Sequence, residues 1–176
     1  MHRISPLAIT IAASLASATV AHADALKGPS SSQVPQVIPT AGGWDVISLI
    51  TTGDAAASNP YRMVGIPDGL GAIAGAYSER LGTDVADRFF MTVFMNHELG
   101  ATSGSVRAHG QAGALVSQWT INLQTLKVFE GQDLIERVLT WQNGAFADTT
   151  GQTAFARFCS GDLPDSSAFY DARSGK

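Results

Sequence analysis

Residues 89–95, FFMTVFM, constrain the fold of this chain more than any other stretch of its sequence. Successive side chains of a β-strand point to opposite faces of the sheet. One face would carry Phe89, Met91, Val93 and Met95, and the other would carry Phe90, Thr92 and Phe94. Because both faces are mostly apolar, the run predicts a strand in the interior of a sheet.

Other segments have the composition and turn signals of short strands. Residues 44–50 and 61–66 predict two strands, and residues 155–159 predict a third. Residues 115–121 and 126–129 predict a hairpin with a four-residue turn between them. Short strands joined by frequent turns predict an all-β fold, namely a sandwich, a barrel or a propeller.

The segments between these strands carry different signals. Residues 67–69, PDG, form a turn signature. Residues 71–76 predict a small, flexible segment, and residues 77–88 predict a polar surface loop. Residues 133–144 have helix-like spacing but fit a strand equally well, so both alternatives stay open.

Residues 1–23 have the features of a secretory signal peptide: a basic start, an apolar stretch diluted with Ala and Ser, and a small-residue cleavage pattern. The alternative is a retained membrane anchor, which needs about 20 strongly apolar residues. We therefore expect an exported protein, secreted or periplasmic, that is soluble and not bound to a membrane after signal removal. Residues 24–43 predict a flexible lead-in, and residues 44–176 predict the folded domain.

Charge and cysteine content narrow the function classes. The formal net charge is −4, and no basic cluster is present, which argues against nucleic acid or an anionic membrane surface as a partner. Cys159 is the single cysteine of an exported chain, so it cannot form a disulfide within the chain. It is a buried thiol, a metal ligand, a free thiol or half of an intermolecular bond.

The apolar run at 89–95 is followed at once by Asn96, His97 and Glu98. If the strand continues, Asn96 and Glu98 share one face, and their oxygens are ligands that calcium favours. The alternative is a cap, in which both side chains hydrogen-bond to loop backbone.

The glycine-rich loop after this strand contains Arg107 and His109. Arg107 could hold a phosphate through two hydrogen bonds, although no Lys follows Gly104 as a phosphate-binding loop requires. His97 does not begin a zinc-protease motif, because the second His is replaced by Ala101. For His97 and His109 we expect structural, hydrogen-bonded imidazoles rather than catalytic bases. A serine-hydrolase elbow is absent.

Residues 158–165, FCSGDLPD, form a second concentration of potential ligands. The thiolate of Cys159 suits iron or zinc, and the carboxylate of Asp162 suits a harder ion. The alternative is a buried cysteine beside an aspartate turn.

Four segments, YRMVGIPDGLGA (61–72), FMNHELG (94–100), VRAHGQAGALVSQWTINLQTLKV (106–128) and RFCSGDLP (157–164), carry a family resemblance. They resemble the N-terminal part of exported bacterial proteins related to the PhoX alkaline phosphatases. That family has a β-propeller fold and uses calcium and iron to hydrolyse phosphate esters. The resemblance implies that residues 44–176 are the N-terminal part of a β-propeller-like phosphatase domain.

The resemblance also implies roles for particular residues. Glu98 is the first candidate metal ligand and Cys159 the second, as an iron ligand. Arg107 and His109 would lie near the mouth of the site, and Asp68 is a weaker candidate. A propeller needs about 4–8 four-stranded blades, of which this chain would supply two or three. The chain could be a fragment, a truncated gene product or one part of a larger assembly, and these three alternatives stay open.

The sequence therefore leads to two hypotheses. The first is a secreted metal-dependent phosphate-ester hydrolase of the PhoX type, acting on a small phosphate ester and completed by the missing C-terminal part of the same protein. The second is a non-catalytic, calcium-binding module with a propeller-like scaffold, since propellers host many proteins that are not enzymes.

Overall fold

The computed structural model describes residues 24–76 and 89–163, and these residues form strands and no helix. The predicted all-β class is therefore confirmed. None of the described residues forms a helix that is long and apolar enough to cross a membrane. The strands are β1 (Ala25–Lys27), β2 (Val46–Ser48), β3 (Pro67–Ala74), β4 (Phe90–His97), β5 (Leu115–Asn122), β6 (Lys127–Asp133), β7 (Leu139–Gln142) and β8 (Ala145–Asp148).

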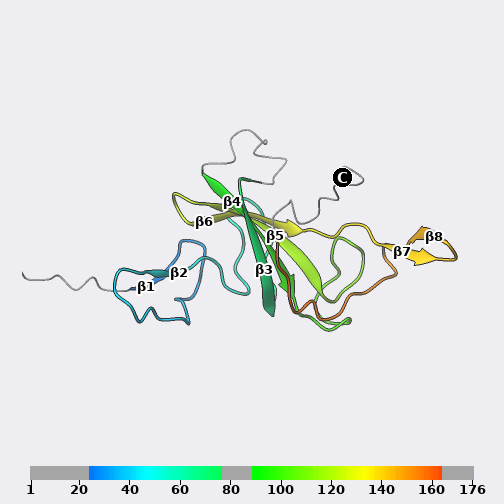
Figure 1. The fold of residues 1–176 in the computed structure, drawn as a ribbon, viewed down its shortest axis with the longest axis horizontal. Helices are drawn as coiled ribbons and strands as arrows, with labels where there is room; N and C mark the ends of the chain where they lie inside the picture. Colours follow the sequence, from blue (N-terminus) through cyan, green and yellow to red (C-terminus); the bar gives the residue numbers. More distant parts are fainter. Residues whose placement is uncertain (1–23, 77–88, 164–176) are drawn as a thin grey trace, which may run out of the picture.

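The centre of the molecule is a four-stranded antiparallel sheet in which β3, β4, β5 and β6 follow one another in chain order. Strands β1 and β2 pair in parallel at one end, and β7 and β8 form a separate hairpin at the other (Figure 1). The described strands do not close into a barrel.

The two strongest strand predictions are confirmed. β4 pairs with β3 on one side and β5 on the other, so it is an interior strand. β5 and β6 form the predicted hairpin. The side-chain oxygen of Asn122 closes its turn by accepting hydrogen bonds from the backbone N–H groups of Gln124 (3.0 Å) and Thr125 (2.9 Å).

The prediction of a turn at 67–69 and a flexible segment at 71–76 is wrong, because most of this stretch is β3. The glycines of β3 have a packing role instead. A side-chain carbon at Gly69 would collide with the backbone of Gly161, and one at Gly71 would collide with the side chain of Leu163. Alternate glycines in a strand can mark such a close approach of another segment.

Two shorter strand predictions also fail. Residues 61–66 contribute only an isolated bridge, between Arg62 and Ala55, and residues 155–159 contribute only a bridge between Phe155 and Gly113. Of the two alternatives left open at 133–144, the helix does not form: the stretch contains the last residue of β6, a non-helical link at 134–138 and the whole of β7.

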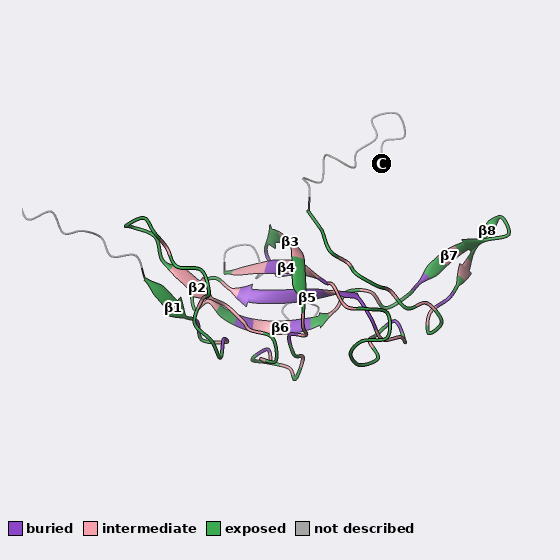
Figure 2. Ribbon diagram, turned by 90° about the horizontal axis from the view of Figure 1, so that it is seen from below, coloured by how far each residue is buried: buried purple, intermediate pink, exposed green. Residues whose placement is uncertain are grey.

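The apolar core lies against one face of the sheet. β5 is the most buried strand in Figure 2. Trp119 of β5 is 1% exposed, and the ring of Tyr61 meets it edge-on with centroids 5.2 Å apart. Gly131 of β6 leaves room for both rings. The core also includes Ala56, Met63, Ile121 and Val128.

The loop at 57–59 covers the outer edge of β6. The backbone N–H groups of Ala57 and Ser58 donate to carbonyls of β6 at 3.0 and 2.9 Å. The side-chain amide of Asn59 donates to the carbonyl of Gly131 at 2.8 Å. The loop therefore satisfies groups that an edge strand would otherwise leave open to another chain.

The predicted signal peptide (1–23), the predicted loop (77–88) and residues 164–176 lie outside the described residues. Within the predicted lead-in, 24–43, β1 is hydrogen-bonded to β2, and Ser31 is buried.

Candidate functional site at the end of β4

The polar end of β4 presents different residues to the two sides of the sheet. His97 is the last residue of the strand, is fully buried and shares the core face with Met95. Asn96 points to the opposite face with Phe94, and both line a pocket there. Glu98 follows the strand, and its backbone N–H donates to the carbonyl of Ile66 at 2.9 Å.

On the core face, His97 belongs to a complete hydrogen-bond network. Its Nε2 lies 2.7 Å from the hydroxyl of Ser117, and its Nδ1 lies 3.2 Å from the carbonyl of Val64. Nδ1 therefore carries the proton and donates to the carbonyl, while Nε2 accepts from Ser117. Burial lowers the pKa of His97, and hydrogen bonds to the carbonyls of Gly65 and Val64 offset part of this effect. His97 is the satisfied, neutral imidazole that the sequence predicted.

Ser117 and His97 resemble a nucleophile and its base, but their surroundings exclude that role. Both side chains are fully buried. The oxygen of Ser117 also accepts a hydrogen bond of 2.7 Å from the indole nitrogen of Trp119. A substrate carbonyl or phosphorus cannot reach this hydroxyl, so the pair is structural.

Arg107 is held in an internal ion pair with Asp133, and their side chains are 10% and 11% exposed. Asp133 also accepts hydrogen bonds from the hydroxyl of Tyr61 (2.6 Å) and the backbone N–H of Ala108 (2.8 Å). Burial alone would raise the pKa of Asp133, but the hydrogen bonds from Arg107 and Tyr61 outweigh it and lower the pKa. The guanidinium is thus engaged inside the protein.

His109 is fully buried, but neither ring nitrogen makes a hydrogen bond within the described part of the chain. Its ring packs against Phe155, with centroids 5.2 Å apart. The expectation of a hydrogen-bonded imidazole is therefore wrong here: among the described residues the ring contact of His109 is with the aromatic side chain of Phe155.

On the opposite side, residues 157–163 cross back over the end of β4, and we call them the crossing segment. The backbone N–H of Arg157 donates to the carbonyl of Leu99 at 2.8 Å. Its guanidinium lies 2.6 Å from the carboxylate of Glu98. The exposed thiol of Cys159 donates to the carbonyl of Arg157 at 3.0 Å, and the neighbouring Glu98 carboxylate raises the pKa of that thiol. Two residues far apart in the sequence, Glu98 and Cys159, are thereby brought together.

A bulge in β3 adds a second carboxylate to this region. The register between β3 and β4 shifts between Pro67 and Leu70, opposite Asn96. Such bulges redirect side chains and are common beside functional sites. Asp68 lies in the bulge, and its charge contributes to raising the pKa of Cys159.

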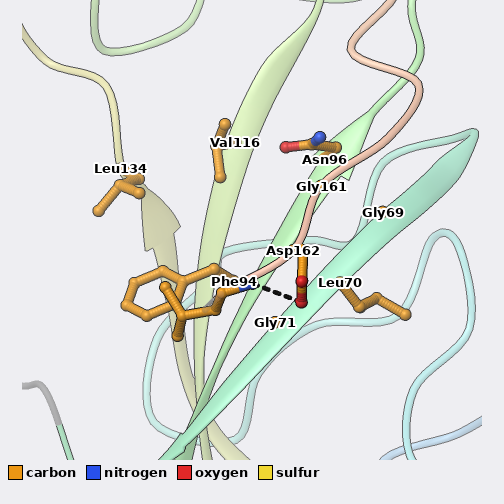
Figure 3. A pocket seen from close by; sticks show the side chains of 10 residues that line it. Gly69, Leu70, Gly71, Phe94, Asn96, Val116, Leu134, Gly161 and Asp162 are labelled. Atoms are coloured by element: carbon orange, nitrogen blue, oxygen red, sulfur yellow. Dashed lines mark hydrogen bonds between the residues drawn. The ribbon is translucent and has the colours of Figure 1, made fainter. Parts of the chain in front are cut away.

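The crossing segment also closes a pocket on this face of the sheet (Figure 3). The amide nitrogen of Asn96 donates to the carbonyl of Ser160 at 2.7 Å. A carboxylate oxygen of Asp162 accepts from the backbone N–H of Leu163 at 2.9 Å. The pocket has a volume of about 230 Å³ and is lined by Gly69, Leu70, Gly71, Phe94, Asn96, Val116, Leu134, Gly161, Asp162 and Leu163.

The structure thus gathers most of the sequence-predicted site residues along the crossing segment. They are Asp68, Asn96, Glu98, Cys159 and Asp162. Arg107 and His109 are not joined to this cluster by any hydrogen bond, ion pair or ring contact among the described residues.

The types of donor atom in this cluster suit the expected metals, but the number of ligands is too small. A thiolate suits iron, and carboxylate and amide oxygens suit calcium. Glu98 and Cys159 supply one donor of each kind, and both contact Arg157. However, no group of three or more His, Cys, Asp or Glu side chains in the described residues could hold a metal ion. A metal here would need ligands beyond these.

Sequence reasoning missed Arg157 at the site, and Tyr61, Ser117 and Asp133 in the buried networks. Arg157 stands two residues before Cys159, so its proximity to the thiol was a usable signal. The other three are distant in sequence from their partners. The sequence supplied one general expectation for them, which is that a buried charge needs a partner.

Comparisons of the chain with protein-family models, with curated proteins and with solved structures found no match.

Proposed function

We propose that this chain forms part of a secreted, metal-dependent phosphate-ester hydrolase of the PhoX type. The observation that carries the proposal is the position of Glu98 and Cys159 on either side of Arg157, whose guanidinium pairs with Glu98 and whose carbonyl accepts a hydrogen bond from the Cys159 thiol. The resemblance had singled out these residues separately, as the two leading metal ligands. The four-stranded meander β3–β6 adds support, because a four-stranded antiparallel sheet is the repeating unit of a propeller.

In this function Glu98 would bind calcium or iron and Cys159 would bind iron, with Asn96 and Asp162 as further oxygen donors. Bound metal would neutralise the phosphate oxygens and polarise the phosphorus atom. Cys159 must lose its proton to bind metal, and Glu98 raises the pKa of that thiol, so metal binding would strengthen as the pH rises.

Arg157 fits the role of phosphate ligand better than Arg107 does. The Arg157 side chain is 71% exposed and its partner is Glu98, whereas Arg107 is 10% exposed and bound to Asp133. If Glu98 binds metal, the guanidinium of Arg157 is released beside it. A guanidinium can then grip two phosphate oxygens at once.

Hydrolysis of 4-nitrophenyl phosphate, with calcium and ferrous or ferric iron added, tests the proposal on the whole chain. We expect turnover that Glu98→Ala and Cys159→Ser abolish. Glu136→Ala, at an exposed glutamate between β6 and β7, is the matched control and should retain turnover. Metal-dependent turnover that survives both Glu98→Ala and Cys159→Ser would show that the metal site lies elsewhere.

A non-catalytic binding or structural module is the second candidate, and a specific observation favours it. The amide of Asn96 donates to the backbone carbonyl of Ser160, as expected of a cap, whereas Glu98 pairs with the guanidinium of Arg157 instead of loop backbone. Thermal melting with calcium and with a chelator separates the two candidates. Calcium stabilisation that Glu98→Ala removes, without any turnover, supports the module.

A further inference from the structure

We propose that the pocket beneath the crossing segment binds a small planar aromatic ring. Under the proposed function, on which this role rests, the ring is the leaving-group part of a phosphate ester. The binding of the ring itself does not depend on catalysis, so the two can be tested separately.

The shape and lining of the pocket define the size and character of its ligand. Its volume of about 230 Å³ lies below the roughly 300–1,000 Å³ typical of pockets for drug-sized ligands, so it accommodates a single ring. Phe94, Val116 and Leu134 give it an apolar wall with one aromatic face. Aromatic rings pack favourably against such a face, offset or edge-on.

The polar rim of the pocket determines which substituents at the edge of the ring it can bind. Asn96 already uses its amide nitrogen on Ser160, and its oxygen lies on the side of Val116 in Figure 3. Asp162 adds a carboxylate with one oxygen engaged by Leu163. Both rim groups offer acceptors, so the rim favours a ring with a hydrogen-bond donor and disfavours one with a negative charge.

The position of the pocket links it to the Glu98–Cys159 cluster. Asn96 and Glu98 are two residues apart, which along an extended chain is about 7 Å. The crossing segment contacts both, because Arg157 pairs with Glu98 and Ser160 bonds to Asn96. One small ester can therefore place its ring in the pocket and its phosphate beside Arg157.

Phenol, phenyl phosphate and methyl phosphate serve as probes, with binding measured by ligand-observed NMR and calorimetry on the whole chain. Val116→Phe should fill the pocket and weaken phenol binding at least about tenfold, the effect of losing roughly 1.4 kcal/mol of contact. Ala72→Leu is the control, because Ala72 lines the neighbouring apolar cavity of about 400 Å³, which shares Leu70 and Gly71 with the pocket, and does not line the pocket itself. Phenol binding should survive it.

The outcomes distinguish this inference from the proposed function. Phenol binding that is insensitive to Val116→Phe, or that Ala72→Leu abolishes, overturns the inference. Phenol binding without ester hydrolysis supports the pocket and counts against the proposed function. Hydrolysis of methyl phosphate as efficient as that of phenyl phosphate supports the proposed function and overturns the leaving-group role of the ring. Should Val116→Phe fail to melt cooperatively, Leu134→Trp at the 41% exposed rim replaces it.

Discussion

The polar residues at the end of β4 differ in burial and in their partners between the two sides of the sheet. On the core side, His97 is fully buried and both of its ring nitrogens have fixed partners. On the other side, Glu98 is paired with an arginine whose side chain is 71% exposed, beside an exposed thiol. A buried and complete network holds one arrangement, whereas a pair whose arginine is exposed and whose glutamate is 18% exposed can exchange the arginine for a ligand.

The free-energy cost of losing a partner differs between buried and exposed residues, and this difference separates structural from functional residues. Removing one partner from a buried polar network leaves a group that water cannot solvate, at a cost of about 1–3 kcal/mol. An exposed ion pair contributes only about 0–1 kcal/mol. The core side should therefore control stability, and the opposite side should control reactivity.

The largest effect is expected on the core side, from Asp133→Ala. This change leaves the guanidinium of Arg107 buried without its partner and should lower the free energy of unfolding by about 3–5 kcal/mol. Urea denaturation measures it. Asp148→Ala, which breaks the exposed pair with Arg137, is the control and should cost far less. Equal losses would show that the Arg107 pair is not effectively buried.

The same carboxylate should make stability depend on pH. The pKa of Asp133 is lower in the folded state than its ordinary value, so its stabilisation is complete above about pH 4 and declines as the pH falls below that value. The stability difference between wild type and Asp133→Asn should therefore shrink from pH 7 to pH 3. A constant difference over this range would contradict the lowered pKa.

A matched pair of substitutions compares the two buried histidines. His97→Leu removes the partner of the Ser117 hydroxyl and should cost about 2–4 kcal/mol. His109→Leu removes a ring without hydrogen-bond partners in the described residues, and should cost clearly less. Chemical denaturation of both variants checks the order. The reverse order would mean that His109 has a polar partner outside the described residues.

A smaller, local effect is expected from Gly71→Ala. The added methyl group would collide with Leu163 and push the crossing segment away from β3. Global stability should fall by about 1 kcal/mol or less, whereas limited proteolysis within the crossing segment should become faster. Ala74→Val, at an exposed position of the same strand, is the control. Unchanged proteolysis in Gly71→Ala would show that the segment does not rest on this glycine.

The smallest change in stability is expected from Glu98→Gln, about 0.5–1 kcal/mol, because Arg157 is 71% exposed and the new amide oxygen can still accept a hydrogen bond at the 18% exposed position. Its effect should appear in the chemistry of Cys159. The carboxylate of Glu98 raises the pKa of that thiol, so its removal should lower the pKa and speed alkylation near pH 8. The rate of iodoacetamide modification measures this change. A slower or unchanged rate would separate the thiol from Glu98.

The sequence allowed the all-β class, β4 and the β5–β6 hairpin to be predicted, because each depends on local patterns of apolar and turn residues. β3 was missed because its small residues read as a turn and a flexible segment. Small residues are needed in β3 because Gly161 and Leu163, which are far along the chain, pack directly against it. The resemblance named Glu98 and Cys159 only as separate candidate ligands, and their approach to each other was not predicted, since spacing alone cannot place two distant loops together.

The loop at 57–59 has a consequence for how this sheet can grow. It occupies the hydrogen-bonding groups along β6, and the described residues place no comparable cover along the outer edge of β3. Lateral addition of another strand at β6 would therefore first have to displace this loop, so the sheet is terminated on that flank.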